Sequence, residues 1–323
     1  MSPTSMTERP AVAPASPERS IPPLRAFIRR HPVLTFYALV FAISWGGVLL
    51  VVGGPGRMPG SAEQTSTLVP VVMMTWFAGP SIAGLTLIGL VDGWAGYRDL
   101  ISRLLQWRVG VRWYAVALVP APLVFMATLL PLSLASPGFL PSLFTTSDKW
   151  SLLLFAIAYV PIGVFLEELG WTGFAVPTLR SRHGVVATSL IVGVLWGATH
   201  VSVIFWLAGS EIGALPLAGF LAVRTFDLLL GGLPAYRVLM VWVHDRTQSL
   251  LVAVLMHASL SATMLMLGPT AVSGAPFLAY CIATSAAWWL IVAALAIATR
   301  RQAPAAAAAA GVKTQGATPV TAT

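Results

Sequence analysis

Long runs of apolar residues, separated by short polar or basic segments, recur along the chain. Several runs hold roughly 18 or more residues with almost no charge, enough to cross a hydrocarbon core of about 30 Å. Backbone groups in lipid must be hydrogen-bonded within their own segment, so these runs are predicted to be helices. The predicted spans are about Val33–Val52, Leu68–Val91, Trp113–Ala135, Leu152–Val176, Val185–Leu207, Pro216–Val243, Leu250–Leu267 and Phe277–Thr299.

The composition agrees with this pattern. The chain is 57% hydrophobic and only 9% charged, whereas soluble domains carry about 25% charged residues. The predicted fold is therefore an all-α, polytopic membrane helix bundle of about eight spans. Cys281 is the only cysteine, which excludes a disulfide framework and a cysteine-rich zinc site.

The basic residues predict the orientation of the bundle. The formal net charge of +8 is explained by membrane topology, since cytoplasmic loops carry an excess of Lys and Arg, and no nucleic-acid partner is expected. If the N-terminus is cytoplasmic, only Arg57 and Lys149 fall outside, while Arg224 and Arg237 lie within the sixth run. Both termini are thus predicted to be cytoplasmic, in a multi-pass protein of the cell membrane that contacts lipids.

The segments outside the spans divide the chain further. Residues 1–28 and 302–323, rich in Pro or Ala, are predicted to be disordered tails around a transmembrane domain at 29–301, and their composition suggests a bacterial chain. Gly93–Arg112 alternates basic and apolar residues at roughly helical spacing. We expect it to be an amphipathic helix on the cytoplasmic membrane surface; a solvated loop is the alternative.

Four ionisable residues interrupt the apolar runs. Glu167 and Glu168 are adjacent in the fourth run, His200 lies in the fifth and His257 in the seventh. A charged side chain near the bilayer centre costs about 2.5–3.5 kcal/mol on insertion scales, and two neighbouring carboxylates resist ionising together. At a helical rise of about 1.5 Å per residue, these groups can share one layer of the bundle.

Several chemistries fit such a layer. Glu167, His200 and His257 could bind zinc with a water in the open position. Alternatively, a glutamate could activate water directly while a histidine stabilises an oxyanion. A polar network that only holds helices together is the structural alternative. Two acids and two histidines on three spans favour a hydrolytic or ion-handling site.

Two arginines within the sixth run need separate explanations. Arg224 and Asp227 are three residues apart, so they can pair on one helix, and a structural role is favoured. Arg237 lies near the cytoplasmic end of the same run. It either extends to the interface or faces the acidic pair.

These residues resemble the motifs of the CPBP intramembrane protease family, which includes the type II CAAX prenyl endopeptidases and bacterial relatives linked to bacteriocin processing or immunity. The first motif, two glutamates followed by a basic residue, corresponds to Glu167-Glu168 with Thr172 in the place of the usual arginine. The second places an aromatic residue four before a histidine, as in Trp196 and His200. The third places a histidine four before an asparagine, where this chain has His257 and Ser261. The resemblance covers roughly residues 93–265.

The resemblance implies an endopeptidase that cuts a peptide or membrane-protein substrate near the cytoplasmic membrane face. Glu167 would activate water and Glu168 would orient it or support a neighbour. His200 and His257 would hold the water, a Zn²⁺ ion or the oxyanion, and a metal-free glutamate mechanism is equally compatible. Because Thr172 brings no positive charge, we hypothesise that Arg237 turns inward and supplies it.

Two other functions compete with the protease. A catalytically weak or silent relative could act as a membrane scaffold, for example in immunity to a peptide toxin. An ion-coupled transporter would also place acidic residues in broken helices, but it predicts repeated halves, and the sequence shows no convincing internal repeat. The oligomeric state and the substrate's identity do not follow from the sequence.

Overall fold

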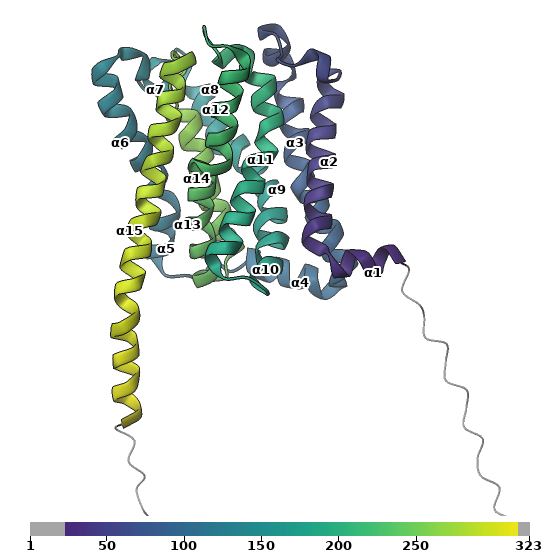
Figure 1. Ribbon diagram of the computed structural model, residues 1–323, viewed down its shortest axis with the longest axis vertical. Coiled ribbons are helices and arrows are strands. Elements are labelled where there is room, and N and C mark those ends of the chain that lie inside the picture. The colour runs from purple at the N-terminus through teal and green to yellow at the C-terminus, as the bar shows by residue number, and fades with distance from the viewer. Residues whose placement is uncertain (1–22, 316–323) are drawn as a thin grey trace, which may run out of the picture.

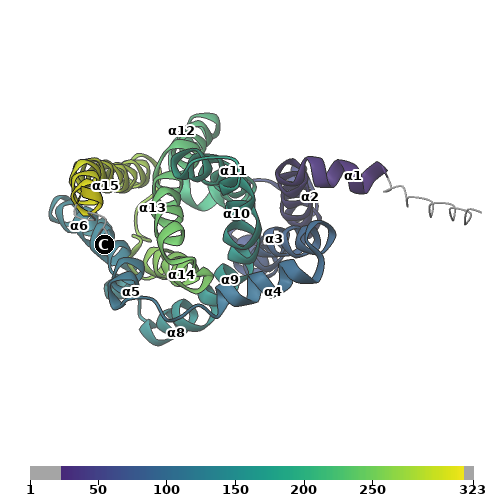
Figure 2. The same ribbon diagram turned by 90° about the horizontal axis from the view of Figure 1, so that it is seen from below.

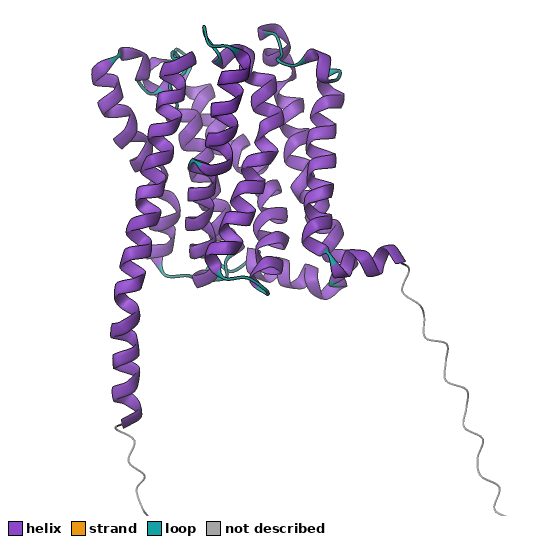
Figure 3. Cartoon of the chain, in the orientation of Figure 1, coloured by secondary structure: helices purple, strands orange, loops and turns teal. Residues whose placement is uncertain are grey.

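The computed structural model describes residues 23–315, and all regular structure in that range is helical (Figure 3). The long helices are α2 (Pro32–Val52), α3 (Ala62–Val91), α6 (Pro120–Ala135), α11 (Val185–Glu211), α12 (Leu217–Leu230), α13 (Gly232–Thr247), α14 (Leu250–Leu267) and α15 (Gly274–Gln315). The shorter ones are α1 (Pro23–Arg30), α4 (Gly93–Leu104), α5 (Val111–Leu118), α7 (Ser142–Thr145), α8 (Lys149–Leu154), α9 (Val160–Gly170) and α10 (Val176–Arg180). Two 3₁₀ turns lie at Pro55–Arg57 and Pro137–Phe139, and two π-helical segments, η3 (Phe155–Tyr159) and η4 (Trp171–Ala175), flank α9.

Eight helical segments in the described part are long and apolar enough to cross a membrane, which confirms the predicted number of spans. The third, fourth and sixth spans are each built from more than one helix, and the sixth breaks between α12 and α13. The described ends of the chain, at α1 and α15, project from the same end of the bundle (Figure 1), as an even number of spans requires. That this end is cytoplasmic stays a prediction.

Both segments expected to be disordered are partly helical. Residues 1–22 and 316–323 lie outside the described residues, but α1 begins at Pro23 and α15 continues to Gln315. Ile28 is buried against the bundle, so tertiary packing orders the start of the described chain. Alanine has the highest helix propensity of all residues, which explains why the Ala-rich segment extends the last helix.

The predicted amphipathic helix exists as α4 and is shorter than expected. It ends at Leu104, not at Arg112, and it lies across one end of the bundle (Figures 1 and 2). Its Leu100 is buried, whereas Trp107, in the following linker, is exposed. The Ser249 hydroxyl donates a hydrogen bond of 2.6 Å to the carbonyl of Gln106, which fixes this linker in a non-helical conformation.

Small residues bring the helices of the core into close contact. A Cβ atom at Gly170, on α9, would lie 2.2 Å from the carbonyl oxygen of Pro80 on α3. One at Gly193, on α11, would lie 2.7 Å from Cα of Pro234 on α13. Small residues allow helices in membranes to approach closely. The helices that carry the acidic pair and Arg237 are therefore tightly held by their neighbours.

Candidate active site

Four of the predicted site residues come from three helices and meet inside the bundle. Glu167 and Glu168 lie on α9, Arg237 on α13 and His257 on α14. All four are buried: Glu168 and Arg237 are 0% exposed, Glu167 is 2% and His257 is 3% exposed. Buried charges are costly unless they are paired and hydrogen-bonded, so the partners of each group decide what it can do.

Glu168 is the centre of the hydrogen-bond network. The Arg237 guanidinium donates to both of its oxygens, at 3.0 Å to Oε1 and 3.1 Å to Oε2. The Thr172 hydroxyl, one turn along the helix, also donates to Oε2. Nδ1 of His257 lies 2.8 Å from Oε1. Because a carboxylate paired with arginine acts as an acceptor, we assign the proton of neutral His257 to Nδ1.

Glu167 has a different environment. Its Oε2 lies 3.6 Å from Nε2 of His257, and it forms no ion pair with an arginine or lysine in the described part of the chain. The indole N–H groups of Trp171 and Trp196 interact with this carboxylate, although neither meets the geometry of a hydrogen bond. Glu167 is thus the one carboxyl group of the pair that no guanidinium neutralises.

Arg237 supplies the positive charge that Thr172 lacks, as hypothesised from the sequence. Its ion pair with Glu168 is fully buried, so extension to the membrane interface is wrong. Its Cζ also lies 4.2 Å from the centre of the Trp196 ring, a favourable cation–π geometry. The Thr172 hydroxyl donates to Glu168, and the positive charge comes from Arg237 on α13.

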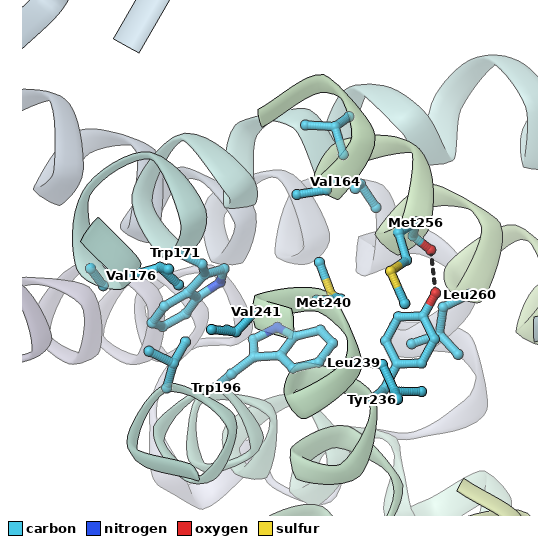
Figure 4. Packing of buried hydrophobic residues seen from close by; sticks show 14 of the residues in the cluster. Val164, Trp171, Val176, Trp196, Tyr236, Leu239, Met240, Val241, Met256 and Leu260 are labelled. Atoms are coloured by element: carbon cyan, nitrogen blue, oxygen red, sulfur yellow. Dashed lines mark hydrogen bonds between the residues drawn. The ribbon is translucent and has the colours of Figure 1, made fainter. Parts of the chain in front are cut away.

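His200 lies beside this network without joining it. Its Nδ1 is 2.8 Å from the carbonyl oxygen of Trp196, which can only accept, so Nδ1 carries the proton. Its ring meets that of Trp76 edge-on at 4.5 Å and that of Trp196 at 5.6 Å. Trp196 also contacts the His257 ring at 4.9 Å, so this indole packs against both histidines. Figure 4 shows Trp171 and Trp196 among the buried hydrophobic residues.

The arrangement does not fit a zinc ion with three protein ligands. Among residues 23–315, no three His, Cys, Asp or Glu side chains are grouped so that they could hold a metal. The predicted set of Glu167, His200 and His257 is divided, because His200 makes its polar contact with the Trp196 carbonyl. A structural or catalytic zinc site needs at least three protein ligands around one point.

Ser261, one turn after His257, is half-buried, and its hydroxyl makes no hydrogen bond within the described residues. Its supporting role stays a prediction. The sequence analysis did not predict that Trp171 is a neighbour of Glu167 or that Trp76 packs against His200. Trp171 lies within the first motif, so its position was a usable signal, whereas Trp76 is brought near only by the packing of α3.

The part of the chain that resembles known proteins is the part that holds these residues. The family model of the type II CAAX prenyl endopeptidases, described as Rce1-like, matches residues 149–263. That range contains α9, α11, α13 and most of α14, and with them every residue of the network. This part of the chain is therefore similar to the type II CAAX prenyl endopeptidases.

One curated protein to which the chain is similar is the CAAX prenyl protease 2 of Methanococcus maripaludis. The two are 28% identical over 147 residues, which is 43% of this chain and 52% of the relative. The chain therefore spans about half the length of the relative it matches. The segment that the family model matches, residues 149–263, lies inside the range 93–265 expected from the motifs.

Proposed function

We propose that this protein is an intramembrane endopeptidase in which Glu167 activates the attacking water. One observation carries the proposal: of two adjacent buried glutamates, only Glu168 is paired with a guanidinium. Arg237 neutralises Glu168, while Glu167 faces Nε2 of His257 at 3.6 Å. A second ionised carboxylate is disfavoured in a buried site, so Glu167 readily accepts a proton, as a general base must.

In the proposed reaction, water bound next to Glu167 gives a proton to this carboxylate while its oxygen attacks the carbonyl carbon of the scissile bond. The carbon–nitrogen bond then breaks, and the protonated Glu167 returns a proton to the leaving amine. Glu168 does not exchange protons; it holds His257 through Nδ1, so that Nε2 can accept a hydrogen bond from the water or from protonated Glu167.

The developing oxyanion needs donors that are already in place. The indole N–H groups of Trp171 and Trp196 are buried and make no hydrogen bond in the described part of the protein, so they are candidates. His200 is the other candidate, since its Nε2 becomes a donor when the ring is protonated. We assign His200 and His257 assisting roles and Glu167 the proton transfer.

The proposed substrate is a peptide or membrane protein whose scissile bond reaches the site from the cytoplasmic face. The curated relative is named a CAAX prenyl protease, which makes peptides ending in a prenylated CAAX sequence one class to test beside unmodified peptides. Glu167 is only 2% exposed, so the helices around it must separate to admit a substrate.

The proposal is tested with the full chain in lipid nanodiscs, incubated with prenylated and unmodified peptide libraries and read by mass spectrometry. We expect Glu167→Gln to lower cleavage roughly 10²- to 10⁴-fold, the range of general-base catalysis, and His257→Ala and His200→Ala to lower it as well. Glu63→Gln, at an exposed residue, is the matched control. Cleavage by Glu167→Gln at the parent rate would overturn the proposal. A chelator arm with zinc added back tests a metal-dependent mechanism.

The deep burial of the acidic pair also suits a second candidate, a catalytically silent scaffold that binds a peptide. The same library distinguishes the two functions. If the parent binds peptides but cleaves none, and Glu167→Gln binds them equally well, the scaffold replaces the protease.

A further inference from the structure

Arg103, at the end of α4, reaches the fourth span from outside the bundle core. Its guanidinium donates to two backbone carbonyls of the π-helical segment η4, at 3.3 Å to Thr172 and 2.9 Å to Gly173. Its Nε pairs with Asp99 on the same helix at 2.9 Å. The Arg103 side chain is only 12% exposed, so its contacts with the two carbonyls are largely shielded from the surroundings.

The sequence limits the backbone donors that these two carbonyls can find within their own helix. In η4 the N–H of Val176 bonds to the carbonyl of Trp171, five residues back, and is therefore taken from Thr172. Pro177 has no N–H, although it stands four residues after Gly173 and five after Thr172. The α-type donor for Gly173 and the π-type donor for Thr172 are thus both absent. Unpaired backbone carbonyls are costly in a membrane protein, and Arg103 donates to both of these.

The same turn of backbone carries a residue of the catalytic network. The Thr172 hydroxyl donates to Glu168, and Arg237 approaches that hydroxyl at 3.5 Å. Glu168 in turn accepts from His257. A contact that fixes the carbonyl of Thr172 therefore also fixes its hydroxyl, the rotamer of Glu168 and, through it, the imidazole that faces Glu167.

Packing reinforces this path. Leu100, one turn before Arg103, is buried. It lies so close to Gly173 that a Cβ atom added to this glycine would be 2.8 Å from Cδ1 of Leu100. Helix α4 thus contacts the π segment twice, once through a guanidinium and once through an apolar side chain. Figure 1 shows α4 at the same end of the bundle as α10.

We propose that Arg103 is a positioning residue, which ties helix α4 to the Glu168–His257 pair through the backbone of Thr172 and Gly173. The expected effect on cleavage rests on the proposed protease function, whereas the contact of Arg103 with the two carbonyls does not. Arg103 acts through other residues and touches neither water nor substrate. Small displacements of catalytic groups are expensive, since about 1 Å can cost roughly 10²-fold in rate.

The kinetic test uses the full chain in nanodiscs and the best-cleaved peptide from the library. We expect Arg103→Gln to lower kcat roughly tenfold or more and to leave KM within about twofold. The kcat of Arg103→Lys should lie between those of the parent and Arg103→Gln, because an ammonium lacks the planar pair of donors that reaches both carbonyls. Arg98→Gln, at an exposed arginine of the same helix, should behave as the parent. Equal kcat in Arg103→Gln and the parent would overturn the inference.

A compensating variant separates positioning from general loss of structure. Pro177→Ala restores a backbone N–H that can reach the Gly173 carbonyl, so Arg103→Gln combined with Pro177→Ala should regain part of the lost kcat. Pro177→Ala alone is the control. If the folded double variant is no more active than Arg103→Gln, the missing donors are not the cause and the inference fails.

A spectroscopic readout keeps the inference testable even if the protein cleaves no peptide. With ¹⁵N-labelled histidine, the signal of His257 is identified by its loss in His257→Gln. We expect Arg103→Gln to shift the Nδ1 resonance of His257, and Arg98→Gln to leave it in place. An unmoved resonance in Arg103→Gln would overturn the positioning role. If the resonance moves but the parent cleaves no peptide, the positioning role stands and only the protease function is refuted.

Discussion

Two arginines of the sixth span, Arg224 and Arg237, are each paired with a carboxylate in a different way. Arg224 on α12 pairs with Asp227, three residues along the same helix, at 3.0 Å. Arg237 on α13 pairs with Glu168, 69 residues away on α9, also at 3.0 Å. We refer to the groups around them as the Arg224 cluster and the Arg237 cluster.

In the Arg224 cluster the carboxylate of Asp227 is matched by its neighbours. One oxygen faces Arg224, and the other accepts from the hydroxyl of Ser285 on α15 at 2.6 Å. The same hydroxyl accepts from the N–H of Gly232 at 2.7 Å, where the sixth span breaks. The predicted ion pair is confirmed, and its contacts join α12, α13 and α15.

The Arg237 cluster holds more acid than its guanidinium can neutralise, and a histidine touches both glutamates. Glu211, at the end of α11, interacts electrostatically with Arg224, but no described histidine is hydrogen-bonded to it. The difference suggests a rule for reading such clusters. A carboxylate matched by one cation stabilises packing, whereas a surplus carboxylate next to an oriented imidazole is equipped for proton transfer.

The largest effect is expected from Arg237→Met. It leaves the buried Glu168 without its cation, and breaking a buried pair in this way costs about 3–5 kcal/mol. We expect loss of cleavage together with a lower free energy of unfolding, measured by denaturant titration in detergent. Arg224→Met is the matched control and should cost less, because the Arg224–Asp227 side chains are 11% and 12% exposed, whereas those of Arg237 and Glu168 are fully buried. Equal destabilisation by the two variants would contradict the distinction between the clusters.

A relocated charge should repair part of this loss. Thr172 stands where the family motif usually has an arginine, and its hydroxyl already reaches Glu168. In Arg237→Met, adding Thr172→Arg places a guanidinium one turn from Glu168, so we expect higher unfolding free energy and partial cleavage compared with Arg237→Met alone. Thr172→Met in the same background is the control. No gain over that control would mean that the charge works only from α13.

Sequence reasoning reached the eight spans and the four central residues because each leaves a strong local signal. A span is an apolar run of fixed minimum length, and a charge within it is costly. The inward turn of Arg237 was reasoned from the missing charge at Thr172. The two alternatives for its side chain were decided only by the fold, which buries it completely.

Other features depend on contacts between distant segments and leave little trace in the sequence. The donors missing from Thr172 and Gly173 require both a π-helical segment and Pro177, and only packing shows that Arg103 fills them. The polar partner of His200 is the carbonyl oxygen of Trp196, and the Trp196 ring packs against both imidazoles. The spacing of these residues along the chain does not show which partner each histidine takes.

The smallest effects come from removing one hydroxyl from each cluster. Ser285→Ala and Thr172→Val each delete a hydrogen bond to a carboxylate that keeps its arginine, so each should lower the unfolding free energy by about 1–3 kcal/mol. Cleavage should separate them, because only Thr172 orients the carboxylate that holds His257. We expect Thr172→Val to lower kcat roughly tenfold and Ser285→Ala to leave it unchanged, measured on the same peptide. Similar stability with different kcat would show that the function of the Arg237 cluster depends on alignment and not on the number of its bonds, while equal kcat would reduce both hydroxyls to packing.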